Sequence, residues 1–184
     1  LALSSVFAMV FLRIDQLLLY RLQGTTVLGL YAPAVKLSEL FNVLPLALMG
    51  SVFPLLAKYH GESEKFLSSL YQVCLKYLLA FIIPIAAWMT LSAQGLFLIL
   101  YGKDFLPSAS AFVILMWAEV FLYICVLNHG LLVSMNKQRI DFVFTAAAAA
   151  VNFAFNLLLI PRFGFVGAAV ASLIAYMVGP VMNC

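Results

Sequence analysis

Charged side chains are scarce in this chain: only 9% of its 184 residues are Asp, Glu, Lys or Arg. Soluble domains carry about 25% charged and about 45–50% apolar residues. Here 66% of the residues are hydrophobic and the mean hydropathy is +1.12, which argues against a water-soluble fold and predicts an integral membrane protein. The net charge of +3 comes from isolated cations, not from basic patches, so we expect no nucleic-acid partner.

Residues that build metal centres and disulfides are equally few. The three cysteines, Cys74, Cys125 and Cys184, lie in apolar segments without Cys-x-x-Cys spacing, which predicts buried free thiols. The two histidines, His60 and His129, are far apart and form no metal-binding signature. No nucleophile–base arrangement or phosphate-binding glycine loop is recognisable, so the sequence predicts neither an enzyme nor a cofactor.

A signal peptide is also lacking, because no basic segment precedes a short apolar run and a cleavage site. The chain begins at Leu1 inside one apolar run and ends at Cys184 inside another. We therefore expect a piece of a longer protein.

Long apolar runs are abundant, and they predict an all-helical membrane bundle of six spans in a single lobe. About 20 apolar residues in a helix cross a bilayer. The expected spans cover residues of about 2–22, 27–57, 66–91, 109–135, 142–160 and 165–182. Pro33, Pro45 and Pro54 predict a kinked second span, since each proline removes one backbone hydrogen bond. The segment Gln94–Tyr101 could end the third span or form a separate interfacial helix.

Polar residues gather in the expected connections and predict the orientation of the spans. Gln23–Thr26 and Pro161–Gly164 indicate turns, and Lys58–Lys65 and Asn136–Asp141 indicate loops. The loops after spans two and four hold Lys58, Lys65, Lys137 and Arg139, and the other connections hold Arg21, Lys103 and Arg162. This excess of one cation predicts that the first set, with both ends of the chain, is cytoplasmic.

Two charges interrupt the first apolar run, at Arg13 and Asp15. A charge at the centre of a span costs roughly 2.5–3.5 kcal/mol on insertion scales, so each of them needs water, a partner or a substrate. Two residues apart on a helix is about 200°, so we expect the two side chains to have different partners. Arg13 could bind a diphosphate, because a guanidinium contacts phosphate oxygens through a fork of donors, or it could form a structural ion pair.

Three further charges lie deep in the expected spans. Lys36 and Glu39 share a helix face at i, i+3 spacing, which favours a mutually neutralising pair and alternatively a cation site or gate. Glu119 is a single acid in the fourth span. It could couple transport to an ion or pair with Arg13 or Lys36. We treat Arg13, Asp15, Lys36 and Glu39 as candidate substrate-binding residues and Glu119 as the candidate ion-coupling residue.

The last two spans carry residues with an expected structural role. Asn152 and Asn156 lie four apart on one face, which predicts hydrogen bonds across helices. Pro161 and Gly164 belong to the turn between the spans. The small residues that recur every fourth position in the last span predict close helix packing, and they are Gly167, Ala171, Ala175 and Gly179.

The order of these features resembles a known transporter family. The segments that carry the resemblance are RIDQLLLYRL, VLGLYAPAVKLSEL, LPLALMGSVFPLLAKY, LYGKDFLPSASAFVILMW and NFAFNLLLIPRFGFVGAAVAS. The best markers are Asp15, Gly29, Leu30, Tyr31, Pro54, Tyr101, Gly102, Phe105, Asn152, Asn156, Ile160, Pro161, Gly164, Gly167, Ala168 and Ala169. Together they are similar to the polysaccharide transporters, or O-antigen flippases, of the multidrug/oligosaccharidyl-lipid/polysaccharide exporter superfamily.

That resemblance implies a fold and a function. The chain would be the second lobe, spans seven to twelve, of a two-lobe transporter resembling the multidrug exporters, and its partner would be the missing N-terminal lobe. Such a protein would sit in the inner (plasma) membrane of a bacterium or archaeon. It would flip polyprenyl-diphosphate-linked oligosaccharides by alternating access, driven by H⁺ or Na⁺, for cell-surface polysaccharide biosynthesis.

Two other functions remain open at this point. An ion-coupled multidrug antiporter would depend on the acids Asp15 and Glu119 and not on Arg13. A non-transporting membrane scaffold subunit would need none of these charges for transport.

Overall fold

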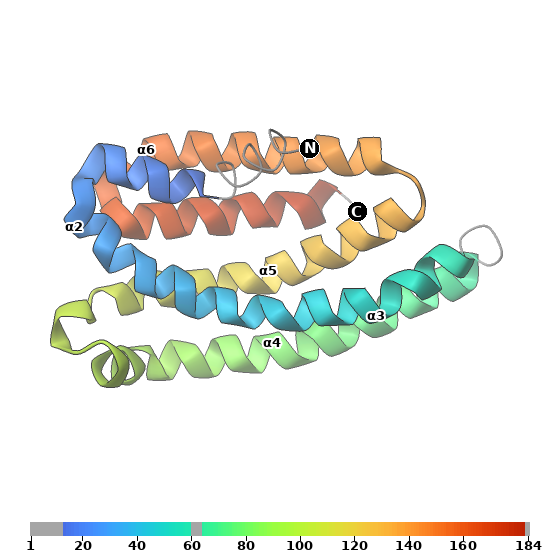
Figure 1. Ribbon diagram of the computed structural model, residues 1–184, viewed down its shortest axis with the longest axis horizontal. Coiled ribbons are helices and arrows are strands. Elements are labelled where there is room, and N and C mark those ends of the chain that lie inside the picture. Colours follow the sequence, from blue (N-terminus) through green and yellow to red (C-terminus); the bar gives the residue numbers. More distant parts are fainter. Residues whose placement is uncertain (1–12, 60–63, 183–184) are drawn as a thin grey trace.

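The computed structural model describes residues 13–59 and 64–182, and every regular element in these ranges is a helix (Figure 1). The α-helices are α2 (Ile14–Glu39), α3 (Val43–Tyr59), α4 (Glu64–Leu100), α5 (Ser108–Ser134) and α6 (Gln138–Met182). Two short 3-10 turns, Leu40–Asn42 and Lys103–Phe105, connect α2 to α3 and α4 to α5. The first half of the expected first span, residues 2–12, lies outside the described residues.

Four helical stretches of the described chain are long and apolar enough to cross a membrane: Ile14–Tyr59, Lys65–Leu100, Ser108–Ser134 and Gln138–Val178. They confirm the prediction of an all-helical, multi-pass membrane protein. Four stretches do not by themselves give the expected lobe of six helices. Large apolar side chains on the outer surface, such as Leu91 (87% exposed) and Ile99 (83%), are what a lipid-facing surface requires.

Two glycines each break a helix. Gly24 (φ 84°) interrupts α2 and Gly164 (φ 57°) interrupts α6, in a region of φ that glycine adopts at little cost. At both places the chain doubles back in Figure 1, so α2 and α6 each consist of two arms. Both glycines lie inside the segments that the sequence indicates as turns.

The kinked stretch after Gly24 shows how a proline is accommodated at membrane depth. Pro45 has no N–H for the carbonyl of Phe41, four residues earlier, and the backbone there passes through the 3-10 turn Leu40–Asn42. The hydroxyl of the buried Tyr123, on α5, donates a hydrogen bond of 2.6 Å to that carbonyl. The acceptor freed by the proline therefore has a donor from a neighbouring helix, as the bilayer interior demands.

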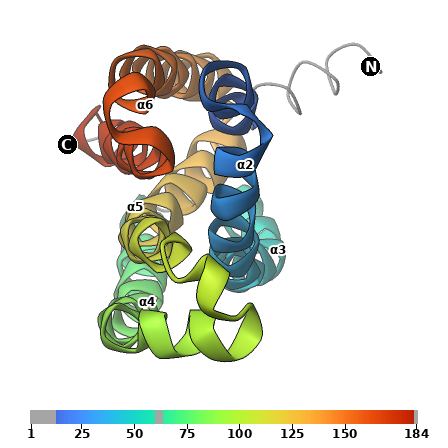
Figure 2. The ribbon, with the colours of Figure 1, turned by 90° about the vertical axis from the view of Figure 1, so that its left-hand side faces the viewer.

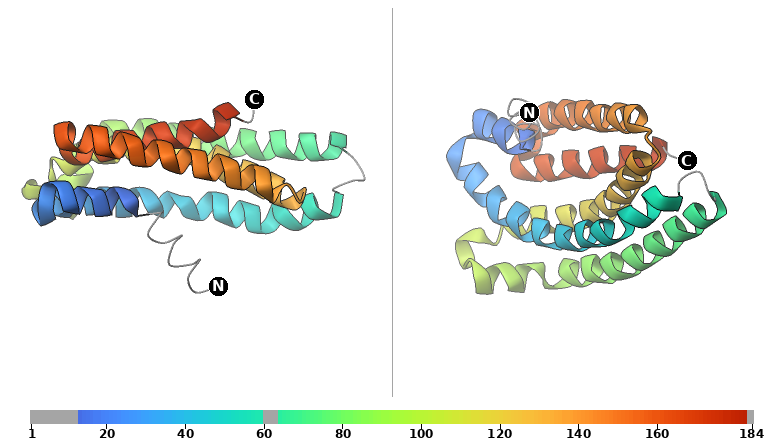
Figure 3. Two further views of the ribbon diagram at one scale, coloured as in Figure 1. Left: turned by 90° about the horizontal axis from the view of Figure 1, so that it is seen from above. Right: turned by 45° about the vertical axis from the view of Figure 1, so that its right-hand side comes forward.

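Helix α5 is the centre of the bundle. It contacts α6, α4, α2 and α3, and half of its most apolar window is buried, against 22% for α4. Viewed end-on, α5 lies between α6 and α4, with α2 passing alongside (Figure 2). The helices share one long axis (Figure 3), so polar residues on α2, α3, α5 and α6 can line cavities along it.

The structure decides one boundary that the sequence left open and shifts another. Gln94–Tyr101 is not a separate helix, because α4 continues without a break to Leu100. The expected loop Asn136–Asp141 is mostly the first turn of α6, where Asp141 suits the positive end of the helix dipole. Only Met135, Asn136 (φ 57°) and Lys137 separate α5 from α6, and asparagine is among the few residues that tolerate a positive φ.

Candidate functional site

A forked ion pair joins the two arms of α2. The guanidinium of Arg13 lies 3.0 Å (Nη1) and 3.3 Å (Nη2) from the two carboxylate oxygens of Glu39. The side chains are 51% and 42% exposed, so the pair lies at the edge of the bundle and is open to an incoming molecule. Its two parallel contacts have the geometry in which arginine also recognises phosphate.

A second contact joins the same arms deeper in the protein. The hydroxyl of Tyr31, whose side chain is fully buried, donates a hydrogen bond of 2.9 Å to Oδ2 of Asp15. Ser172, on the second arm of α6, lies within hydrogen-bonding reach of Tyr31. Asp15 and Arg13 therefore have different partners, as their helical spacing predicts.

These two contacts border a cavity of about 520 Å³ between α2, α3, α5 and α6. The polar or ionisable side chains that line this first cavity are Arg13, Asp15, Gln16, Tyr31, Ser38, Glu39, Asn42, Glu119, Ser172 and Tyr176. Intramembrane charges usually face the bundle interior or a cavity, where water, a partner or a ligand compensates for the loss of hydration. The first cavity therefore combines an arginine, three acids and several neutral hydrogen-bonding groups.

Glu119 forms part of the buried wall of the first cavity. The residue is 5% exposed, and its Oε2 atom has no hydrogen-bond partner. The side chain of Asn42 lies within hydrogen-bonding reach of Glu119, and the carboxylate of Glu39 is close enough to repel it. The Oδ1 atom of Asn42 is also buried without a partner. Two oxygen acceptors in this wall thus lack a donor or a cation.

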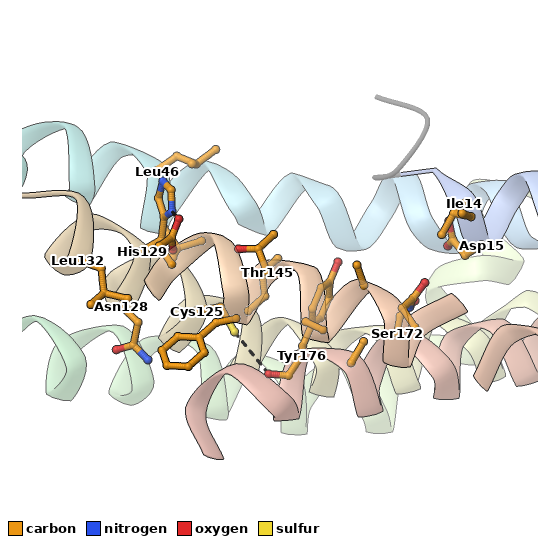
Figure 4. A pocket seen from close by; sticks show the side chains of 18 residues that line it. Ile14, Asp15, Leu46, Cys125, Asn128, His129, Leu132, Thr145, Ser172 and Tyr176 are labelled. Carbon is orange, nitrogen blue, oxygen red and sulfur yellow. Dashed lines mark hydrogen bonds and ion pairs between the residues drawn. The ribbon is translucent and has the colours of Figure 1, made fainter. Parts of the chain in front are cut away.

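A second, more apolar cavity of about 380 Å³ adjoins the first and shares Asp15, Ser172 and Tyr176 with it. Figure 4 shows Ile14 and Asp15 at one end of this cavity, with His129 and Leu132 towards the other. Nδ1 of His129 lies 2.9 Å from Oδ2 of Asp141, which links the end of α5 to the start of α6. The Cys125 thiol donates to the Tyr176 carbonyl, across 3.4 Å.

Lys36 does not join this arrangement. It is exposed and lines neither of the two cavities. The expected Lys36–Glu39 pair is replaced by the Arg13–Glu39 pair, because the bend at Gly24 brings a guanidinium to Glu39 and offers two contacts where an ammonium offers one point charge. Helical spacing within one arm could not reveal this partner from the other arm.

The expected structural residues lie in and around the α6 reversal. Asn156 is buried and donates both to the carbonyl oxygen (2.9 Å) and to Oδ1 (2.8 Å) of Asn152, so this bonding runs within α6 and not across helices. A Cβ atom at Gly167 would lie 2.5 Å from the carbonyl oxygen of Leu159, so the two arms of α6 touch through their backbones there. Pro161 and Gly164 lie at the bend itself.

Sequence reasoning did not identify six polar residues of the first cavity as functional candidates: Gln16, Tyr31, Ser38, Asn42, Ser172 and Tyr176. In the sequence Tyr31 contributes only to the family resemblance, and the signal that could have identified it is a hydroxyl within an apolar run. The signal for Asn42 is a single amide within LFNVLP, deep in an apolar segment, which is the kind of polar residue that membrane helices place against a partner.

Comparisons with known proteins match the chain to one protein family and to two archaeal proteins. A family model described as "Polysaccharide biosynthesis protein" matches residues 1–110. An uncharacterized membrane protein of Methanocaldococcus jannaschii is 29% identical over 102 residues, 55% of this chain and 20% of that protein. A probable low-salt glycan biosynthesis flippase of Haloferax volcanii is 21% identical over 156 residues, 84% of this chain and 33% of that protein. The chain thus spans a fifth to a third of these curated relatives, and no solved structure matches it.

Proposed function

Because the chain belongs to the polysaccharide biosynthesis protein family, we propose that it is one lobe of a flippase that moves a lipid-linked glycan across the membrane. The similarity to a probable glycan biosynthesis flippase supports this function, and the archaeal membrane proteins among its relatives support a plasma-membrane location. The cargo is a saccharide joined to a polyprenyl lipid through a diphosphate, of which O-antigen precursors are one example. The rest of the flippase, an opposing lobe, supplies the other half of the path.

One observation supports the cargo-binding part of the proposal most directly: the half-exposed guanidinium of Arg13 at the first cavity. Its two contacts with Glu39 are those that a diphosphate would make in place of the carboxylate. A diphosphate carries more negative charge than a carboxylate, so it competes well for Arg13. Asp15 and Glu39 then hold the two arms of α2 in register before the cargo arrives.

The six-helix lobe is supported by the chain reversals at Gly24 and Gly164. If each arm of α2 and α6 counts as a separate pass, the four long stretches become six passes. Alternating access then follows from rocking this lobe against its partner, with the lipid tail left in the bilayer. Glu119 is our candidate for the ion-coupling residue, with H⁺ or Na⁺ as the ion. A part for Lys36 in headgroup binding stays a prediction.

Surface glycan in living cells tests the proposal. Replacing Arg13→Gln removes the charge but keeps the side chain's length and polarity, and it should abolish glycan display while leaving the protein in the membrane. Arg162→Gln is the matched control, because Arg162 is exposed at the α6 bend and lines neither cavity. Normal glycan display in the Arg13 variant would refute the proposal. Loss of cationic-dye efflux in Asp15→Asn and Glu119→Gln, with Arg13→Gln unaffected, would instead support the multidrug antiporter.

A further inference from the structure

The buried wall of the first cavity contains polar atoms that have no hydrogen-bond partner. Buried polar atoms nearly always have a partner, and an unmatched one costs about 1–3 kcal/mol. Here Oε2 of Glu119 and Oδ1 of Asn42 are both buried without one. Both atoms are acceptors, so a hydrogen-bond donor or a cation would satisfy them and an anion would not.

A second carboxylate lines the same cavity. Glu39 precedes Asn42 by three residues on a continuous helical stretch, and its charge acts on Glu119. Two carboxylates that interact in one cavity repel each other unless a cation or a proton lies between them. Oxygen atoms from carboxylates and an amide are the ligands that hard cations prefer.

Glu39 cannot serve this site while Arg13 holds it. Both oxygens of its carboxylate face the guanidinium, at 3.0 and 3.3 Å. Whatever removes Arg13 from Glu39 therefore supplies a free carboxylate to Asn42 and Glu119. In the proposed flippase, that agent is the anionic headgroup.

We propose that Glu39 is exchanged between Arg13 and a cation site that it forms with Asn42 and Glu119, so that an anion bound to Arg13 promotes binding of Na⁺ or H⁺. This inference rests on the proposed function in that the diphosphate of the cargo is the anion. The charges balance, because the anionic headgroup neutralises Arg13 and the cation neutralises Glu39. Because linkage is reciprocal, the cation strengthens headgroup binding by the same factor.

Among the described residues no group of three or more His, Cys, Asp or Glu side chains could hold a metal ion. The site here uses two acids and an amide, a set that suits a single monovalent cation or a proton. Na⁺ and H⁺ would both neutralise the same carboxylates, and calorimetry distinguishes between them.

Calorimetry on the full natural chain in lipid nanodiscs tests the exchange, with inorganic pyrophosphate as the anion. If the cation is Na⁺, pyrophosphate should tighten Na⁺ binding by about 5- to 150-fold, the usual range of coupling between sites. If it is H⁺, pyrophosphate binding should take up about one proton, measured by comparing two buffers of different ionisation enthalpy. Both effects should vanish in Glu119→Gln and weaken in Asn42→Ala, and Asp104→Asn, an exposed acid outside both cavities, should behave as wild type.

The Arg13→Gln variant separates this inference from the proposed function. With Glu39 already free, the variant should bind the cation tightly without pyrophosphate and show no further response to it. Failure of wild type to bind pyrophosphate would remove Arg13 as the headgroup site, while the gain of cation affinity in Arg13→Gln would still support the exchange. Unchanged cation binding in both Arg13→Gln and Glu119→Gln would overturn the exchange.

Discussion

Arg13 and Glu39, 26 residues apart in the chain, form a forked ion pair at the edge of a cavity that also contains Asp15 and Glu119. The bend at Gly24 makes this pair possible, because it folds the first arm of α2 back beside the second. The pair keeps the guanidinium of Arg13 oriented before an anion binds. Four changes in and around this arrangement give measurable consequences.

Glu39→Gln should increase the affinity for inorganic pyrophosphate. The carboxylate competes with the anion for Arg13, and an ion pair this exposed contributes about 0.2–1 kcal/mol, so the gain should be up to about fivefold. Calorimetric titration of the nanodisc-embedded protein measures it, with Asp104→Asn as the control. A weaker affinity in Glu39→Gln would mean that Glu39 helps to bind the anion directly.

Tyr31→Phe should destabilise the protein by about 1–3 kcal/mol, because it leaves the Asp15 carboxyl group without its donor deep in the bundle. Tyr20→Phe removes the hydroxyl of an exposed side chain on the first arm of α2, the arm that carries Asp15, and should cost little. Denaturant unfolding in detergent, followed by circular dichroism, compares the two variants. Equal stability of Tyr31→Phe and Tyr20→Phe would contradict the role of the Tyr31–Asp15 bond.

Tyr123→Phe should cost about 1–2 kcal/mol, because the Phe41 carbonyl loses its donor. In a Pro45→Ala background the cost should shrink, since the alanine N–H can bond to the same carbonyl. A double-mutant cycle on unfolding free energies tests this coupling. Additive effects of the two substitutions would show that the hydroxyl does not compensate for the proline.

Gly167→Ala should disrupt the packing of the two arms of α6, because its Cβ would lie 2.5 Å from the Leu159 carbonyl oxygen and the backbone would have to move. Gly50→Ala meets nothing within 4 Å and should be tolerated. Measuring the thermal unfolding midpoint of each variant compares their stabilities directly. A Gly167 variant as stable as the Gly50 variant would mean that the arms separate at little cost.

The sequence predicted the parts of the fold that depend on local pattern. Hydropathy gave the long helices, and the glycines of two polar turns gave the reversals at Gly24 and Gly164. The sequence left open whether Gln94–Tyr101 ends the third span, as it does in α4. It placed Gln138–Asp141 in a loop although α6 already begins there, because polarity alone does not end a helix when the backbone can continue.

The candidate site was less accessible from the sequence. Rarity of charge in an apolar run was enough to single out Arg13, Asp15 and Glu119. Partners were not predictable, because the pairing of Arg13 with Glu39 depends on the angle at Gly24. The contribution of Asn42 likewise depends on how α2, α3 and α5 pack around one cavity, which no spacing within a single helix encodes.

The central claim is that Arg13 holds the anionic headgroup of a lipid-linked glycan during its passage. The most direct measurement reconstitutes the full natural protein into vesicles that contain a fluorescent polyprenyl-diphosphate-linked oligosaccharide and follows its transfer between leaflets. Wild type and Arg162→Gln should transfer the lipid at equal rates, and Arg13→Gln should not exceed the rate of protein-free vesicles. Transfer by Arg13→Gln at the wild-type rate would contradict the account.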